Sequence, residues 1–171
     1  NENLHLIQGA LFDEGEVLNA VKGADAVLSA LGGNIDGTDK TRSLGIKNIV
    51  KQMGKAGVSR IIAVGGTGLL TDPASEDGNM LLQSEDYPAE YAAVAQEHLK
   101  AYEYLEVSSL SWTMLCPPYI INEGPTGLFQ TSANLPPNPD NGKINAGDLA
   151  LFMLGELEKN QYLKKRVGIS N

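Results

Sequence analysis

The chain has 171 residues, which is enough for one domain with its own hydrophobic core. Its composition is typical of a soluble globular protein, with 42% hydrophobic and 20% charged residues, and no apolar run is long enough to span a bilayer. The net charge of −8 argues against a general nucleic-acid-binding protein. The one cysteine, Cys116, excludes an intrachain disulfide and fits a reducing cytoplasm; its apolar surroundings predict a packed core thiol.

Short apolar runs alternate with amphipathic stretches along the chain. The runs read as strands lie at residues 4–11, 26–31, 61–64, 110–121 and 166–170. The fourth strand must stop at Pro117-Pro118, because proline cannot donate to the ladder. The stretches read as helices lie at residues 14–22, 41–56, 89–107 and 148–160, the last with Asp148 as its N-cap. This alternation predicts an α/β fold with a mostly parallel sheet in a single domain, residues 1–171.

Two segments lack such a pattern. Residues 71–88 are polar and contain several turn signals, and we expect a lid or binding loop there, with one short turn near residues 80–82. Residues 122–143 are rich in Gly, Pro and Asn and predict no long element.

The strand at residues 61–64 ends in three glycines, Gly65, Gly66 and Gly68. Ligands of open α/β sheets bind at the carboxyl ends of the strands. This exit is therefore the first candidate for a binding site.

The order of several segments resembles one protein family. The segments are LHLIQGALFD, GADAVLSALGG, GIKNIVKQMGKAGVSRIIAVGG, EHLKAYEYLEVSSLSWTMLCPPYI and DLALFML followed by KRVGIS. Together they resemble the atypical short-chain dehydrogenase/reductases, of the NAD(P)-binding, NmrA-like and biliverdin-reductase-B-like kind. The resemblance implies a Rossmann-like fold, NADP or NAD as cofactor, a small-molecule substrate and no metal site.

Members of that family open with a strand and a GxxGxxG loop that holds the cofactor diphosphate. Neither element occurs here. The glycine-rich stretch Gly65–Gly68 follows the family's fifth strand rather than its first, so we do not read it as the GxxGxxG loop. We therefore expect an N-terminally truncated fold without the first two strands. In the family's strand order the loss leaves a slot of roughly 10 Å between residues 4–11 and 26–31, and predicts an altered sheet, a homodimer or strand exchange between copies.

The resemblance assigns two segments to the adenosine and diphosphate side of the cofactor. They comprise Gly9, Ala10 and Leu11, and then Ala30, Leu31, Gly32 and Gly33. Ala10 stands where relatives often carry an acid that contacts the adenine amine, and alanine removes that contact.

A further set is assigned to the nicotinamide side: Val64, Gly65, Gly66, Pro117, Pro118 and Tyr119. Thr67 falls in the region of the catalytic serine of classical members. Its hydroxyl either contacts a substrate carbonyl or bonds its own backbone in a turn.

His98 is the main catalytic candidate. Classical reductases use Tyr-x-x-x-Lys for proton donation, and this chain contains no such pair. A gap-free match places His98 at the lysine position, where flavin- and biliverdin-reducing relatives carry histidine. We expect either a proton donor that titrates near neutral pH or a structural histidine. Tyr91 is a weaker candidate, and His5 is expected to be exposed.

Three functions follow from these observations. The first is an NAD(P)H-dependent oxidoreductase that reduces a small planar acceptor such as a flavin or quinone. The second is a non-catalytic NAD(P)-binding redox sensor, favoured by the missing Tyr-x-x-x-Lys. The third is a fragment that cannot bind cofactor.

Overall fold

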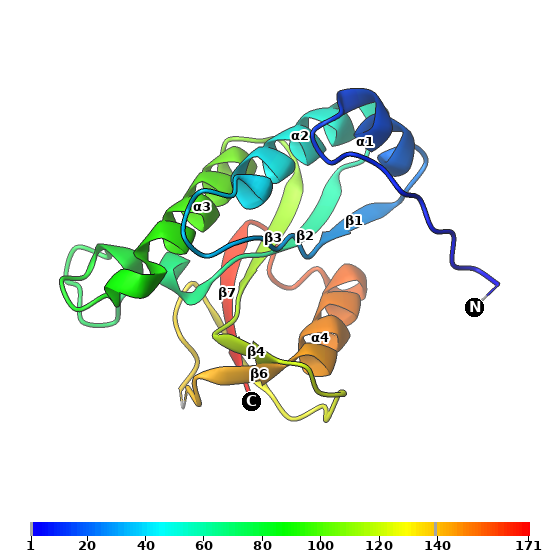
Figure 1. Ribbon diagram of the computed structural model, residues 1–171. Coiled ribbons are helices and arrows are strands. Elements are labelled where there is room, and N and C mark those ends of the chain that lie inside the picture. Colours follow the sequence, from blue (N-terminus) through cyan, green and yellow to red (C-terminus); the bar gives the residue numbers. More distant parts are fainter. Residues whose placement is uncertain (1, 139) are drawn as a thin grey trace.

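Helices and strands alternate up to residue 116, as the sequence predicts, and short strands then follow one another before the last helix (Figure 1). The computed structural model describes residues 2–138 and 140–171. The helices are α1 (Glu14–Val21), α2 (Thr41–Ala56), α3 (Ala89–Glu106) and α4 (Ala146–Lys159), with two short 3-10 turns, η1 (Thr67–Leu69) and η2 (Leu81–Gln83). The strands are β1 (Ala26–Ser29), β2 (Arg60–Val64), β3 (Ser111–Cys116), β4 (Tyr119–Ile121), β5 (Gln130–Ala133), β6 (Lys143–Asn145) and β7 (Lys165–Ser170).

Five strands form the main sheet, in the order β1-β2-β3-β7-β5. The first four are parallel and β5 is antiparallel to β7, which confirms the mostly parallel α/β fold. Strands β4 and β6 pair separately as a small parallel ribbon. Because β2 and β3 are neighbours in register, their carboxyl ends meet at one edge of the sheet.

The sheet carries a hydrophobic core on each face. Along β2, Ile61 and Ala63 pack into one core while Ile62 and Val64 pack into the other, as the period of two in a strand requires. Helices α1, α2 and α3 cover the first face, and α4 covers the second (Figure 1). No helix in the part of the chain that the structure describes is both long and apolar enough to cross a bilayer.

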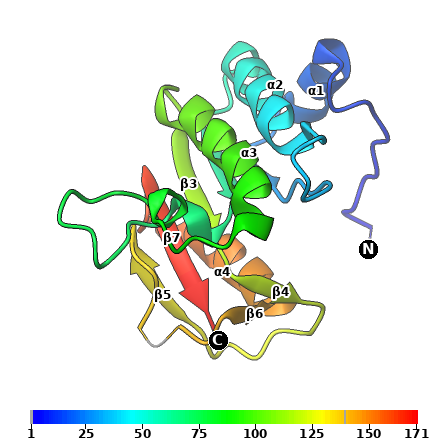
Figure 2. The same cartoon turned by 60° about the vertical axis from the view of Figure 1, so that its left-hand side comes forward.

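Residues 4–11 form no strand, so this prediction was wrong. The segment runs away from the body of the molecule (Figures 1 and 2), and its apolar side chains before Leu11 are exposed, with Leu6 at 89%. Among the described residues β1 pairs only with β2, so no strand offers residues 4–11 a ladder of hydrogen bonds. The sheet therefore begins at β1, without the slot expected between the two segments.

The start of α4 also differs from the prediction. The helix begins at Ala146 with Asn145 as its N-cap, so Asp148 lies in the first turn rather than at the cap. The buried Asp148 carboxylate instead accepts hydrogen bonds from Thr126, Gly127 and Asn171. Burial alone raises the pKa of Asp148, but these hydrogen bonds outweigh it and lower the pKa to about 2.

Candidate functional site

A cleft of about 520 Å³ opens where β2 and β3 end. That volume lies within the usual range for a small-molecule site. Three groups of residues line it: the exit of β2, the exit of β3 and the first half of α3 with the turn before it. They are Gly65, Gly66, Thr67, Gly68 and Leu69; Pro117, Pro118, Tyr119 and Ile120; Tyr87, Pro88, Tyr91, Val94, Ala95 and His98; with Ile35, Arg42 and Gly142 completing the wall.

His98 lies against the exit of β2. A Cβ atom placed on Gly66 would lie 3.2 Å from His98 Cδ2, so the imidazole packs on the backbone of this glycine. Any other residue at position 66 would have to push the ring aside. The structure thus brings together Gly65, Gly66, Thr67 and His98, as the sequence predicts, with Pro117, Pro118 and Tyr119 in the same cleft.

The imidazole of His98 is neutral at pH 7. Burial, with a smaller contribution from the nearby Arg42 guanidinium, lowers the pKa of His98 to about 4. Among the described residues no hydrogen bond to the ring occurs. The expectation of titration near neutral pH was therefore wrong, because the ring is desolvated and faces a positive charge.

This depressed pKa predicts an acid-sensitive fold. Below the unfolded-state pKa of 6.5 the unfolded chain binds a proton that the folded chain does not bind, so stability falls as pH decreases towards 4. We expect this histidine to cost about 2 kcal/mol of unfolding free energy between pH 7 and pH 5. Urea unfolding of the wild type and His98→Gln at both pH values measures it, and an equal pH dependence in the two would contradict the assignment.

Two hydroxyl groups face the cleft beside His98. Thr67 begins η1, and its carbonyl accepts from Leu70 N at 2.9 Å, whereas its hydroxyl makes no hydrogen bond within the described ranges. Tyr87 lies against Gly68, where an added Cβ would come within 2.7 Å of the phenol oxygen. Burial raises the pKa of Tyr87, so the phenol keeps its proton at neutral pH. Both groups can donate to a ligand.

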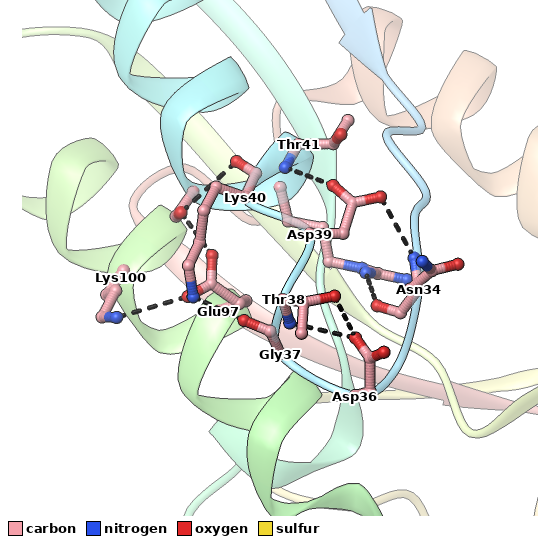
Figure 3. Close-up of polar contacts among 11 residues, drawn as sticks. Asn34, Asp36, Gly37, Thr38, Asp39, Lys40, Thr41, Glu97 and Lys100 are labelled. Carbon is pink, nitrogen blue, oxygen red and sulfur yellow. Dashed lines mark hydrogen bonds and ion pairs between the residues drawn. The ribbon is translucent and has the colours of Figure 1, made fainter.

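The loop of residues 33–40 is fastened to the start of α2 (Figure 3). The Asp39 carboxylate accepts from Thr41 N at 2.7 Å and from Asn34 N at 3.2 Å. In the other direction, Arg42 donates to the carbonyls of Asn34 and Gly33, each at 2.9 Å. These contacts fix Arg42 at the cleft wall.

The same loop is tied to α3 through Glu97, whose side chain is only 2% exposed (Figure 3). Lys40 Nζ lies 2.9 Å from Glu97 Oε1 and also donates to Gly37 O at 2.6 Å. Lys100 Nζ lies 3.2 Å from the same carboxylate oxygen, and the Ser43 hydroxyl donates to the other. Burial alone would raise the pKa of Glu97, but the hydrogen bonds from Ser43, Lys40 and Lys100 outweigh it and lower the pKa.

The residues predicted for the adenosine side do not line the cleft. Leu11 and Leu31 pack against the core under α1–α3, and Ala10 N donates to Glu16 Oε2 at 2.5 Å. Gly9, Ala30 and Gly32 lie along the same two segments. Gly33 is connected to the site through its carbonyl, which accepts a hydrogen bond from Arg42. Val64 packs into the core on the α4 face rather than lining the cleft, because it alternates with Ala63 along β2.

Sequence reasoning missed Arg42 and Ile35. One signal was available for Arg42, since a cation in the first turn of a helix is unfavourable with the helix dipole. A positive residue in that place therefore indicates a role that outweighs the unfavourable interaction with the helix dipole. Ile35 carries no comparable signal, because the path of the loop brings it to the cleft.

Comparison with known proteins identifies the family. The sequence profile of a family described as NAD(P)H-binding matches residues 1–160. The chain belongs to this NAD(P)H-binding family. The family's cofactor is thus the one expected, NADP or NAD, while the finer NmrA-like placement stays a prediction.

Solved structures of the same architecture agree with this family. A protein of Burkholderia pseudomallei named as exported is 33% identical, with a TM-score of 0.79, over 95% of this chain and 79% of its own. SP1627 of Streptococcus pneumoniae TIGR4, named as an NADH-flavin reductase, is 26% identical, with a TM-score of 0.80, over 95% and 78%. A short-chain dehydrogenase/reductase of Veillonella parvula DSM 2008, solved with NADP, is 18% identical, with a TM-score of 0.70, over 96% and 71%, and shows the Rossmann-like fold.

The described residues fit the nicotinamide end of the family's cofactor. Gly66 leaves space beside His98 that a Cβ would fill, whereas a Cβ on Gly65 would instead meet the side chains of Met114 and Leu69. The first amide of α2 does not offer a diphosphate site, because the Asp39 carboxylate already accepts from Thr41 N. The cleft thus suits a planar ring, and the adenosine-side assignments stay predictions.

Proposed function

We propose that this chain is an NAD(P)H-dependent oxidoreductase that reduces a small planar acceptor of the flavin or quinone kind. The observation that carries the proposal is the cleft where β2 and β3 end, with His98 packed on the backbone of Gly66. Membership of the NAD(P)H-binding family and the similarity to a protein named NADH-flavin reductase support it.

The residues of the cleft have distinct tasks in this proposal. The bound nicotinamide supplies a hydride, and rate then depends mainly on how the protein positions the acceptor. The backbone of Gly66 permits close approach of a ring beside His98. Tyr119, which is 76% exposed at the cleft, provides a flat surface against which the acceptor stacks.

His98 acts here as a neutral hydrogen-bonding group. With a pKa of about 4 it carries no proton to give up as an imidazolium at neutral pH. The ring N–H instead donates to an acceptor oxygen or nitrogen and fixes its orientation. The proton that completes reduction of the acceptor comes from solvent.

Steady-state turnover with a panel of flavins and quinones tests the proposal. We expect NADPH or NADH oxidation, with kcat/KM about tenfold lower in His98→Ala, the loss of one hydrogen bond of about 1.4 kcal/mol. His5→Ala is the matched control, since His5 lies on the exposed segment before α1. Equal turnover in His98→Ala and the wild type would contradict the role of His98.

The non-catalytic alternative rests on the absence of Tyr-x-x-x-Lys from the chain. Titration of NADPH and NADH fluorescence separates it from the oxidoreductase. Binding without turnover of any acceptor would favour a sensor. No binding of either nucleotide would show that this chain cannot hold the cofactor.

A further inference from the structure

The cleft has a single full charge on its lining, and that charge is positive. With His98 neutral, Arg42 is the only charged side chain among the described residues that line it. No aspartate or glutamate of the described ranges lines the cleft. This is unexpected in a chain with a net charge of −8.

Arg42 also differs from Arg60, whose guanidinium is likewise held at more than one point. Arg60 forms a buried ion pair with Glu156 at 3.0 Å. Arg42 donates only to the carbonyls of Gly33 and Asn34, and within the described ranges no carboxylate lies at ion-pair distance from it. Asp39 interacts with it at longer range: hydrogen bonds from Thr41 and Asn34, with a smaller contribution from Arg42, lower the pKa of Asp39. The Nε of Arg42 is buried and has no hydrogen-bond partner in that same part of the chain.

A guanidinium held in place by backbone carbonyls keeps its charge available. Carbonyl oxygens accept hydrogen bonds from the guanidinium N–H groups without neutralising its charge. A guanidinium also binds carboxylate and phosphate oxygens well. An acidic group entering the cleft would be the only one there to pair with this cation. We infer that Arg42 is a specificity-determining residue that binds the acidic group, carboxylate or phosphate, of an anionic planar acceptor.

This inference rests on the proposed function, because it names the class of acceptor for the same cleft. The acidic group could also come from the cofactor, which carries phosphates. Two flavins separate these sources, since FMN and riboflavin share one ring system and differ by a phosphate. Quenching of flavin fluorescence measures their binding directly, without turnover.

We expect the wild-type chain to bind FMN about tenfold more tightly than riboflavin. Arg42→Gln should bind the two flavins equally, and Arg42→Lys should keep part of the preference because it keeps the charge. Lys47→Gln is the matched control: it removes one positive charge from the same helix at a side chain that packs on Tyr104, outside the cleft. Circular dichroism of each variant verifies that α2 and its loop are folded.

Three outcomes would overturn the inference. One is a wild-type chain that binds neither flavin or both equally. Another is a preference for FMN that survives in folded Arg42→Gln. The third is that Arg42→Gln binds NADPH and NADH more weakly but keeps the wild-type ratio of flavin affinities. That result would show that Arg42 pairs with a phosphate of the cofactor. If only the proposed function is wrong, the result is different: the chain turns over no acceptor but still binds FMN more tightly than riboflavin.

Discussion

Replacing Gly147 with alanine is expected to lower the free energy of unfolding by about 3 kcal/mol, at the upper end of overpacking effects. A Cβ at this position in the first turn of α4 would lie 2.2 Å from Pro125 N and 2.4 Å from Gly124 C. Both are backbone atoms, so no side-chain rotation relieves the overlap. Gly147 N also donates to Glu123 O at 3.0 Å, and this bond would be strained as the two segments separate.

Gly155, in the same helix, provides the control. A Cβ there meets nothing within 4 Å, and alanine favours a helix interior over glycine. We expect Gly155→Ala to raise the unfolding free energy by about 0.5–1 kcal/mol. Urea unfolding followed by the fluorescence of Trp112, the only tryptophan, measures both variants. Equal effects of the two substitutions would show that the close approach of Pro125 does not limit position 147.

Replacing Glu97 with alanine is expected to cost about 2–3 kcal/mol of unfolding free energy, from a lost buried hydrogen-bond acceptor and the space it leaves. The Ser43 hydroxyl would lose its main partner. Lys40 and Lys100 are 45% and 52% exposed and would regain water, which keeps the cost below that of an isolated buried charge. Glu103→Ala, at an exposed position of the same helix, should change stability by less than about 0.5 kcal/mol.

The pH dependence of Glu97 has a definite sign. Its folded-state pKa lies below the ordinary glutamate value, so its contribution is present above the unfolded pKa and is lost as pH falls through the folded pKa. Glu97→Gln removes this dependence. If Glu97→Gln lost stability in acid as steeply as the wild type, the carboxylate would not be the group responsible.

Local pattern was sufficient for the long helices and the central strand. Helix α2 matches its predicted range, α3 ends one residue earlier than predicted, and β2 begins at Arg60. The prediction of a strand at residues 4–11 was wrong because an apolar run shows only that a segment can join a sheet. It does not show that a neighbouring strand exists. Strand β5 was missed for the opposite reason, since its polar residues Gln130–Ala133 carry no alternation and β7 alone supplies the ladder.

The site was predictable where strand ends define it. Gly66, Thr67 and Pro118 meet because β2 and β3 are parallel neighbours, and His98 joins them from α3. Arg42 was not predictable in the same way. Its place depends on the loop of residues 33–40, whose path is set by contacts from Asp39 to the start of α2 and from Lys40 to Glu97.

The attachment of this loop to α3 bears on the size of ligand that can enter. Glu97 holds the loop and His98 follows it directly on the helix, so the walls that carry Ile35 and His98 are linked through this carboxylate. The facing wall, formed by Tyr119 and Ile120, belongs to the short β4–β6 ribbon. Under the proposed function, selection of an acceptor by size would then depend on β4, and selection by charge on Arg42 of α2.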